Sequence, residues 1–140
     1  FGIRLDTSTS ARLFMVKLVF QKFTKHFILG YGITGFSFID GHFIRTLIEL
    51  GTLGLVTFIW LLVRIHRVIL EVKNKSQHPR IKGTAIGLYA GFWALVVHAF
   101  SANTFLIVRI SEPFWSFVGL MIIAQSHLNI NAENIELIEK

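Results

Sequence analysis

The sequence predicts an all-α, polytopic membrane protein in which an outer amphipathic helix and loop precede two to three transmembrane helices. Two observations lead to this prediction. Hydrophobic residues make up 53% of the 140-residue chain and charged residues only 16%, whereas soluble domains have roughly 45–50% and 25%. In addition, two apolar stretches reach the ~20 residues that a helix needs to cross a bilayer.

Residues 1–45 are expected to form an external segment with an amphipathic helix and a glycine turn. Large apolar residues recur at helical spacing over 11–27, lysines and an arginine lie between them, and Ser10 is a suitable N-cap. Such a helix would lie at the membrane–water boundary or pack on the spans. The sequence starts at Phe1 without an initiator methionine, so we expect a fragment of a longer chain whose missing N-terminal transmembrane helices complete the fold.

The first transmembrane helix is predicted over 46–65 and the second over 84–103. Residues 104–125 are expected to hold an outer connection and a probable third helix. Small residues recur every four positions at the start of the second span, which predicts close helix packing. These residues are Gly83, Gly87 and Gly91.

The predicted loop over 66–83 determines the expected orientation. Between 64 and 82 the chain carries six lysines and arginines but one acid, Glu71. Short basic loops face the cytoplasm. This places 1–45 on the periplasmic side and 126–140 in a cytoplasmic tail.

Composition also argues against several classes of function. The formal net charge is +6, yet the basic residues do not alternate with stacking aromatics, so no nucleic-acid partner is expected. The chain has no cysteine, which excludes disulfides, thiol nucleophiles and cysteine-ligated metals. Six histidines without a matching carboxylate pattern do not predict a metal site. No cofactor is expected.

The run from Gly30 to Gly35 formally matches the G-x-G-x-x-G dinucleotide fingerprint. That fingerprint works between a strand and a helix N-terminus, where a pyrophosphate binds. Here the residues before the match are predicted to be helical, and the residues after it read as extended or loop. The simpler interpretation is that Gly30 ends the amphipathic helix and that Gly32 and Gly35 permit tight turns.

Three motifs follow one another between 8 and 65. The chain reads S-x-R before a helix, then H-x-I-L-G-Y-G-x-x-x-F, then H-x-x-x-x-L-x-E-L-G-x-L-G-L. This order resembles the O-antigen ligase and polymerase family of bacterial inner-membrane proteins. The matching residues are Arg12, Gly30, Gly32, Phe36, His42, Leu47, Glu49, Gly51 and Gly54. Two positions differ: Phe43 stands where the family usually has Asn, and His26 where it usually has Pro.

The resemblance implies transfer or polymerisation of a glycan from an undecaprenyl diphosphate carrier to an acceptor glycan or glycolipid, at the periplasmic face of the inner membrane. His42 is the candidate catalytic residue, because an imidazole can accept a hydroxyl proton near neutral pH. Arg12, Arg45 and Glu49 are the candidate substrate-binding residues, since arginine binds phosphate through two parallel hydrogen bonds. A helix that begins near Gly41 would place His42, Arg45 and Glu49 on one face.

Each of these residues also has a plainer interpretation. His42 could be an interfacial histidine with a satisfied hydrogen bond, Arg12 an interfacial cation, and Arg45 and Glu49 a pair that neutralises itself. The alternative function is a non-enzymatic membrane transport or lipid-binding protein, whose basic outer segment binds anionic membrane lipids. A family member that has lost its activity is a third alternative. The sequence does not distinguish ligase from polymerase, and the fragment alone is expected to be inactive.

Overall fold

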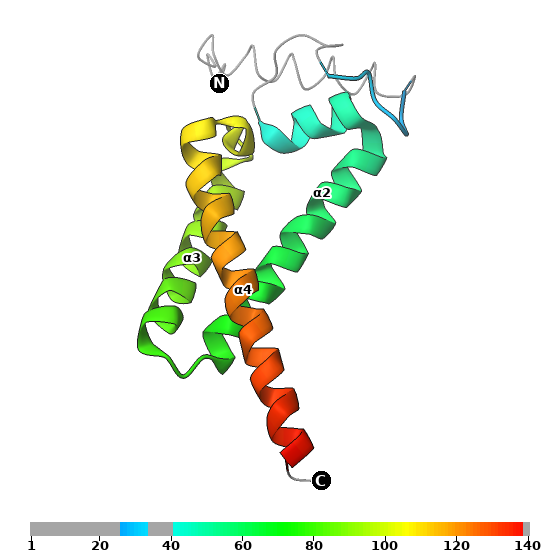
Figure 1. Cartoon of the computed structure of the whole chain (residues 1–140). Helices are drawn as coiled ribbons and strands as arrows, with labels where there is room; N and C mark the ends of the chain where they lie inside the picture. The colour runs from blue at the N-terminus through cyan, green and yellow to red at the C-terminus, as the bar shows by residue number, and fades with distance from the viewer. Residues whose placement is uncertain (1–25, 34–40, 139–140) are drawn as a thin grey trace, which may run out of the picture. The chain divides into compact units, whose positions relative to one another are not determined.

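The computed structural model describes residues 26–33 and 41–138 (Figure 1). The predicted helix over 11–27 falls almost wholly outside these residues, as does Arg12. The chain divides into two compact parts. The N-terminal unit comprises the described residues up to Ile59 together with Ala99–Asn103, and the helical unit comprises Trp60–His98 and the residues from Thr104 onward.

All regular structure in the described residues is helical, which confirms the predicted all-α class for that part of the chain. The elements are α2 (His42–Lys75), α3 (Pro79–His98), a 3-10 turn η1 (Thr104–Leu106) and α4 (Val108–Ile138). Two of these helices, α2 and α3, are long and apolar enough to cross a membrane. The helix α4, which contains the predicted third span, is not among the two.

The helices extend beyond the bounds that bilayer thickness suggested. Only residues 76–78 separate α2 from α3, where the sequence predicted a loop over 66–83, and α4 continues through most of the predicted tail. The length of an apolar stretch predicts how much of a helix a bilayer could hold. It does not predict where the helix itself ends. The last turns of α2 keep buried apolar residues, and Glu71 accepts a hydrogen bond from Lys75 one turn later at 2.6 Å.

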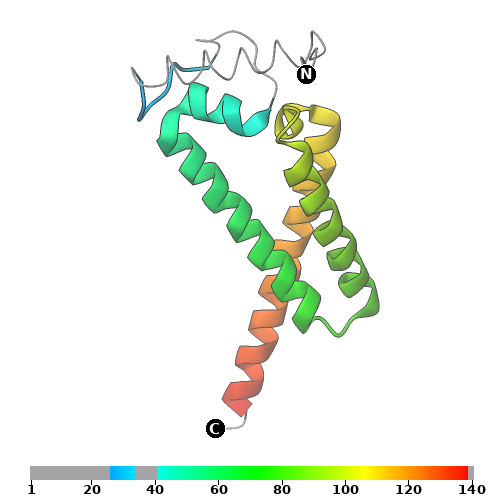
Figure 2. The ribbon, with the colours of Figure 1, turned by 180° about the vertical axis from the view of Figure 1, so that it is seen from behind.

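Buried residues in the helical unit follow helical spacing. On each helix they recur three, four or seven positions apart, which places them on one face. They are Leu62, Ile65, Ile69 and Val72 on α2, Ala85 and Phe92 on α3, and Phe114, Val118 and Met121 on α4. α3 and α4 lie side by side in both ribbon views (Figure 1, Figure 2). These faces form the core of the unit.

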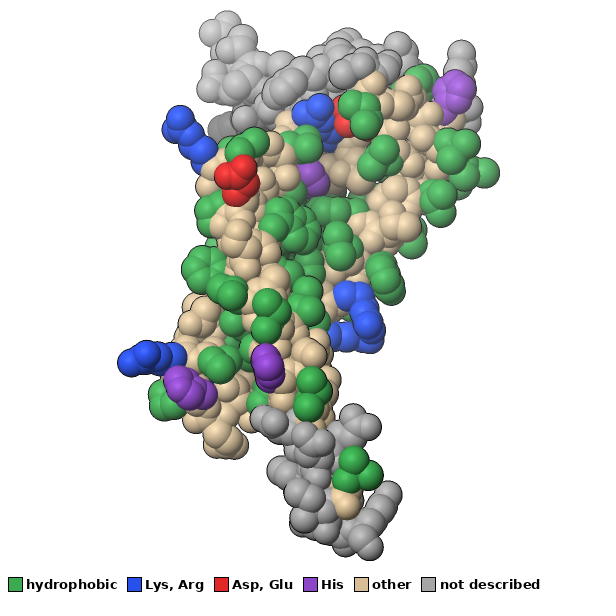
Figure 3. Space-filling model, viewed as in Figure 1, with side chains coloured by type: hydrophobic (Ala, Val, Ile, Leu, Met, Phe, Trp, Pro, Cys, Tyr) green, Lys and Arg blue, Asp and Glu red, His purple; other side chains and the backbone are tan. Residues whose placement is uncertain are grey.

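The other helix faces are strongly apolar but exposed. Only 22% of the apolar window of α2 and 11% of that of α3 is buried within the chain. Figure 3 shows hydrophobic side chains over much of the visible helix surface. Among the described residues nothing packs closely on the glycines of α3, because a Cβ at Gly83, Gly87 or Gly91 would meet nothing there within 4 Å. Such surface is typical of a partner or a lipid environment rather than of water.

Candidate functional site

The candidate site in the N-terminal unit is built around a break in α2. Gly51 has φ 70° and ψ −169°, so the first piece of α2 (42–50) ends there and a second piece starts at Thr52. Figure 1 shows the resulting bend near the start of the helix. A positive φ of this size favours glycine. Such a break leaves carbonyl groups without helical partners before Gly51 and amide groups without them after it.

The glycine turn, residues 26–33, supplies partners for these groups. Four backbone hydrogen bonds join the turn to the break, two with donors in the turn and two with donors in α2. They run from Tyr31 N to Ile48 O (2.8 Å), Gly32 N to Glu49 O (2.9 Å), Thr52 N to Phe27 O (3.0 Å) and Leu53 N to Ile28 O (3.4 Å). The Thr52 hydroxyl also donates to Phe27 O at 3.1 Å. The turn therefore stabilises the break.

Two glycines allow the backbones to approach this closely. Gly30 has φ 69°, and a Cβ there would lie 2.5 Å from Ile48 O and 2.6 Å from Gly51 N. A Cβ at Gly51 would collide with Ile28 O. Any side chain at either position would push the backbone of the turn away from the backbone of α2. The glycine turn belongs to the second motif of the family resemblance, and the E-L-G run that ends at Gly51, called the E-x-G motif below, belongs to the third. These two motifs thus contact each other.

Arg45 and Glu49 pair on the first piece of α2. Arg45 Nε donates to Glu49 Oε1 at 2.9 Å, and the two side chains are 25% and 16% exposed. The prediction that they share a helix face is therefore confirmed, and so is the plainer interpretation that they pair. The bond uses only Nε of the guanidinium. The same carboxylate residue contributes its backbone carbonyl to the glycine turn, so the pair is fixed next to the break.

His42 begins α2 and is fixed by its backbone. Its N–H donates to Ala99 O at 2.8 Å and to Ala102 O at 3.2 Å. The side chain is only 7% exposed, and its ring centroid lies 4.9 Å from that of Phe58. Sixteen residues of straight helix would separate these two positions by about 24 Å. The break at Gly51 therefore brings the histidine back over the second piece of α2.

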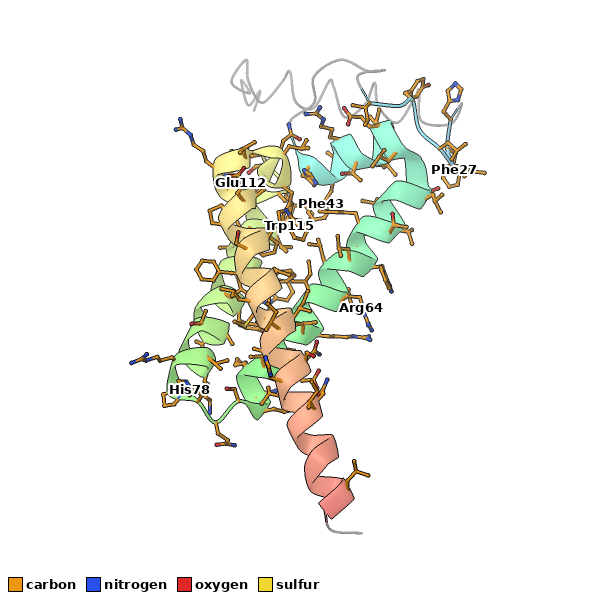
Figure 4. All side chains as sticks on the ribbon, in the orientation of Figure 1. Phe27, Phe43, Arg64, His78, Glu112 and Trp115 are labelled. Atoms are coloured by element: carbon orange, nitrogen blue, oxygen red, sulfur yellow. The ribbon has the colours of Figure 1, made fainter. Side chains whose placement is uncertain are left out.

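Phe43, which replaces the usual family Asn, lies in the same aromatic cluster. Its ring centroid is 4.8 Å from that of Phe100 and 6.0 Å from that of Phe58. Figure 4 shows Phe43 on the first piece of α2. The position thus has a packing role here, which a polar Asn would not fill. Phe58 and Phe100 were not predicted as part of this cluster, because helical spacing alone does not show that a break returns one piece of α2 onto the other.

The electrostatics of the site favour a neutral imidazole. His42 precedes the predicted span over 46–65. Burial lowers its pKa below the usual value, the positive charge of Arg45 lowers that pKa further, and the negative charge of Glu49 raises it in part. A histidine with a lowered pKa stays unprotonated to more acidic pH and can accept a proton there.

The structure thus brings together three of the four predicted site residues, namely His42, Arg45 and Glu49. Arg12 lies outside the described residues. Among the described residues no group of three or more His, Cys, Asp or Glu side chains is placed to hold a metal ion. Comparison of the chain with protein-family models, with curated proteins and with solved structures gives no match.

Proposed function

We propose that this chain belongs to a membrane glycosyltransferase that resembles O-antigen ligases and polymerases. One observation carries the proposal. The glycine turn and the E-x-G break are two motifs of the resemblance, and four backbone hydrogen bonds hold them together. This bonded contact between the glycine turn and the break, called the joint below, sets the position of the first piece of α2. That piece carries His42, Arg45 and Glu49. Two motifs that serve one site are expected to lie in contact, and these two do.

The proposed location is the bacterial inner membrane, with the His42 end of α2 on the periplasmic side. Two helices of suitable length and apolarity support a membrane location. The basic residues between 64 and 82 support the orientation through the preference of lysine and arginine for the cytoplasmic side. A donor anchored in the same membrane by its undecaprenyl tail would then present its diphosphate at the level of the break.

The proposed reaction exchanges one carbon–oxygen bond for another. The hydroxyl oxygen of the acceptor sugar attacks the anomeric carbon of the donor glycan, and the bond from that carbon to the diphosphate breaks. The carrier diphosphate leaves with the bonding electron pair. The hydroxyl proton passes to the neutral imidazole of His42, which later releases it to water. The donor already carries its leaving group, so the reaction needs no nucleotide sugar.

The cations of the site would offset the charge that develops on the leaving diphosphate. Arginine suits this role because its planar guanidinium donates parallel hydrogen bonds to phosphate oxygens. Arg45 would act from the first piece of α2, with Glu49 orienting it through the 2.9 Å bond. Arg12 would act from the N-terminal segment. Charge compensation at this step is what distinguishes a diphosphate site from a general basic surface.

The proposal is tested with the purified full-length protein, a labelled undecaprenyl diphosphate-linked glycan and its acceptor. We expect His42→Ala to abolish transfer while donor binding remains. The matched control is His78→Ala, because His78 is exposed in the short connection between α2 and α3 (Figure 4). Equal transfer by the two variants would contradict a catalytic role for His42.

The alternative, a lipid-binding or transport protein, predicts a different pattern in the same assay. Replacing Lys17, Lys22 and Lys25 together should then abolish binding of anionic lipid, and His42→Ala should change little. For the transferase, the triple variant should retain turnover once the donor is saturating, because these lysines supply only long-range attraction.

A further inference from the structure

The glycine turn exposes a row of large apolar side chains. Ile28 is 63% exposed, and Leu29 and Ile33 are each 73% exposed. Figure 4 shows the neighbouring Phe27 at the outer edge of the turn. In the same unit, Leu53 and Val56 of α2 are 56% and 63% exposed, immediately after the point where the turn is bonded. The turn and the second piece of α2 thus form one exposed apolar surface in the N-terminal unit.

We propose that residues 27–33 insert into the lipid bilayer beside α2, on the side of the membrane where His42 lies. The partner of this surface is the hydrocarbon of the membrane that α2 crosses. The inference requires that α2 span a membrane, and it does not require that the protein transfer glycans.

The level of the turn follows from its hydrogen bonds. Thr52 and Leu53 donate to Phe27 O and Ile28 O. Thr52 starts the second piece of α2, and the first piece bends away from it at Gly51, so these bonds attach the turn to the outer end of the piece that would cross the membrane. The turn is therefore held at the outer end of this piece, where the headgroup region gives way to hydrocarbon. A turn that faces water usually exposes polar residues, whereas this turn exposes Phe27, Ile28 and Leu29.

The hydrogen bonds of the break also suit a membrane setting. An unpaired backbone amide or carbonyl in hydrocarbon costs several kcal/mol, so a non-helical backbone is tolerated at membrane depth only where its polar groups have partners. Ile48 O and Glu49 O receive donors from the turn, and the amides of Thr52 and Leu53 find acceptors in it.

The charges next to the turn fit the lipid headgroups. His26 directly precedes the apolar residues, and Lys22 and Lys25 precede it in the sequence. Basic residues that flank an inserted apolar segment are attracted to anionic headgroups at the surface. The order of basic residues followed by consecutive large apolar residues therefore matches the order of headgroup and hydrocarbon that an inserting turn meets.

The test uses single-cysteine variants of the full-length protein in nanodiscs of phosphatidylethanolamine and phosphatidylglycerol. The 140 residues contain no cysteine, so a nitroxide label can be placed at Leu29, Val56 or Gln77 without a competing thiol from this segment. The rates of collision with oxygen, which concentrates in hydrocarbon, and with a water-soluble nickel complex are measured for each label. Ile33→Cys supplies a second probe of the turn in case the label at Leu29 perturbs folding.

We expect the oxygen-to-nickel ratio at Leu29 and Ile33 to exceed that at Gln77 several-fold, as the ratio at Val56 does. A ratio at both turn positions as low as at Gln77, with a high ratio at Val56, would overturn the insertion and leave the glycan-transfer proposal intact. Low collision rates with both reagents in the turn would mean that protein covers it, which also overturns the inference. A low ratio at Val56 would overturn both the insertion and the membrane span.

Discussion

Replacing Gly30 with alanine should destabilise the joint between the glycine turn and α2. Gly30 has φ 69°, and a left-handed conformation costs an alanine about 1–2 kcal/mol. Its Cβ would also lie 2.5 Å from Ile48 O and 2.6 Å from Glu49 O. These two oxygens accept hydrogen bonds from Tyr31 and Gly32, and each bond contributes about 0.5–1.5 kcal/mol. The expected loss is therefore about 2–5 kcal/mol.

Gly32→Ala is the matched control for this substitution. Gly32 has φ 82°, so an alanine there suffers the same backbone strain, yet its Cβ would meet nothing within 4 Å. The expected loss is only about 1–2 kcal/mol. The difference between the two variants, about 1–3 kcal/mol, isolates the close approach of the two backbones. It corresponds to about a 5- to 150-fold difference in the opening equilibrium, since each 1.4 kcal/mol is a factor of ten.

The assay is hydrogen–deuterium exchange of the Thr52 and Leu53 amides, measured on the full-length protein in nanodiscs. These two amides donate to the turn, so they exchange when the joint opens. We expect these amides to exchange about 5- to 150-fold faster in Gly30→Ala than in Gly32→Ala. Equal exchange in the two variants, at equal thermal stability, would refute the close contact between turn and break.

Three further predictions concern the site and the core. Arg45→Met should move the acid limb of the pH–activity profile to higher pH, because it removes a positive charge that lowers the pKa of His42. Glu49→Gln should move the same limb to lower pH, because it removes a negative charge that raises that pKa. Shifts of both variants in the same direction would contradict the assignment of the acid limb to His42. Phe43→Ala should lower the free energy of unfolding by about 1–3 kcal/mol, less than for a fully buried ring, and an unchanged denaturation midpoint would exclude the aromatic cluster. Ile69→Ala should cost about 2–5 kcal/mol in the same denaturation assay, because Ile69 is fully buried. A cost below about 1 kcal/mol would refute the helical core.

The helices could be predicted because their signal is local. Apolar length indicated α2 and α3, and the four-residue spacing of Arg45 and Glu49 correctly predicted that their side chains share a helix face. The helix ends could not be read in the same way. The buried Ile69 and Val72 continue the core face of α2 among its charged residues, and Glu71 pairs with Lys75 there, while the predicted loop was placed where charge begins.

The joint could not be derived from spacing, because backbone atoms make it. The bonds between Tyr31 and Ile48 and between Thr52 and Phe27 connect segments about twenty residues apart, and a backbone amide carries no sequence signature. The glycines are the indirect signal, since only glycine fits where two backbones meet. The contact between His42 and Phe58 follows from the same break. This contact could therefore not be predicted without knowing the position of the break.

The most direct test of the proposed function is surface glycan analysis of cells whose full-length gene carries His42→Ala, with His78→Ala as the control and membrane expression checked for both. The account predicts that His42→Ala cells lose ligated or long-chain glycan and accumulate the lipid-linked donor at a normal protein level, while the control is unchanged. A normal glycan profile in His42→Ala cells would contradict glycan transfer through His42 and would favour the lipid-binding alternative.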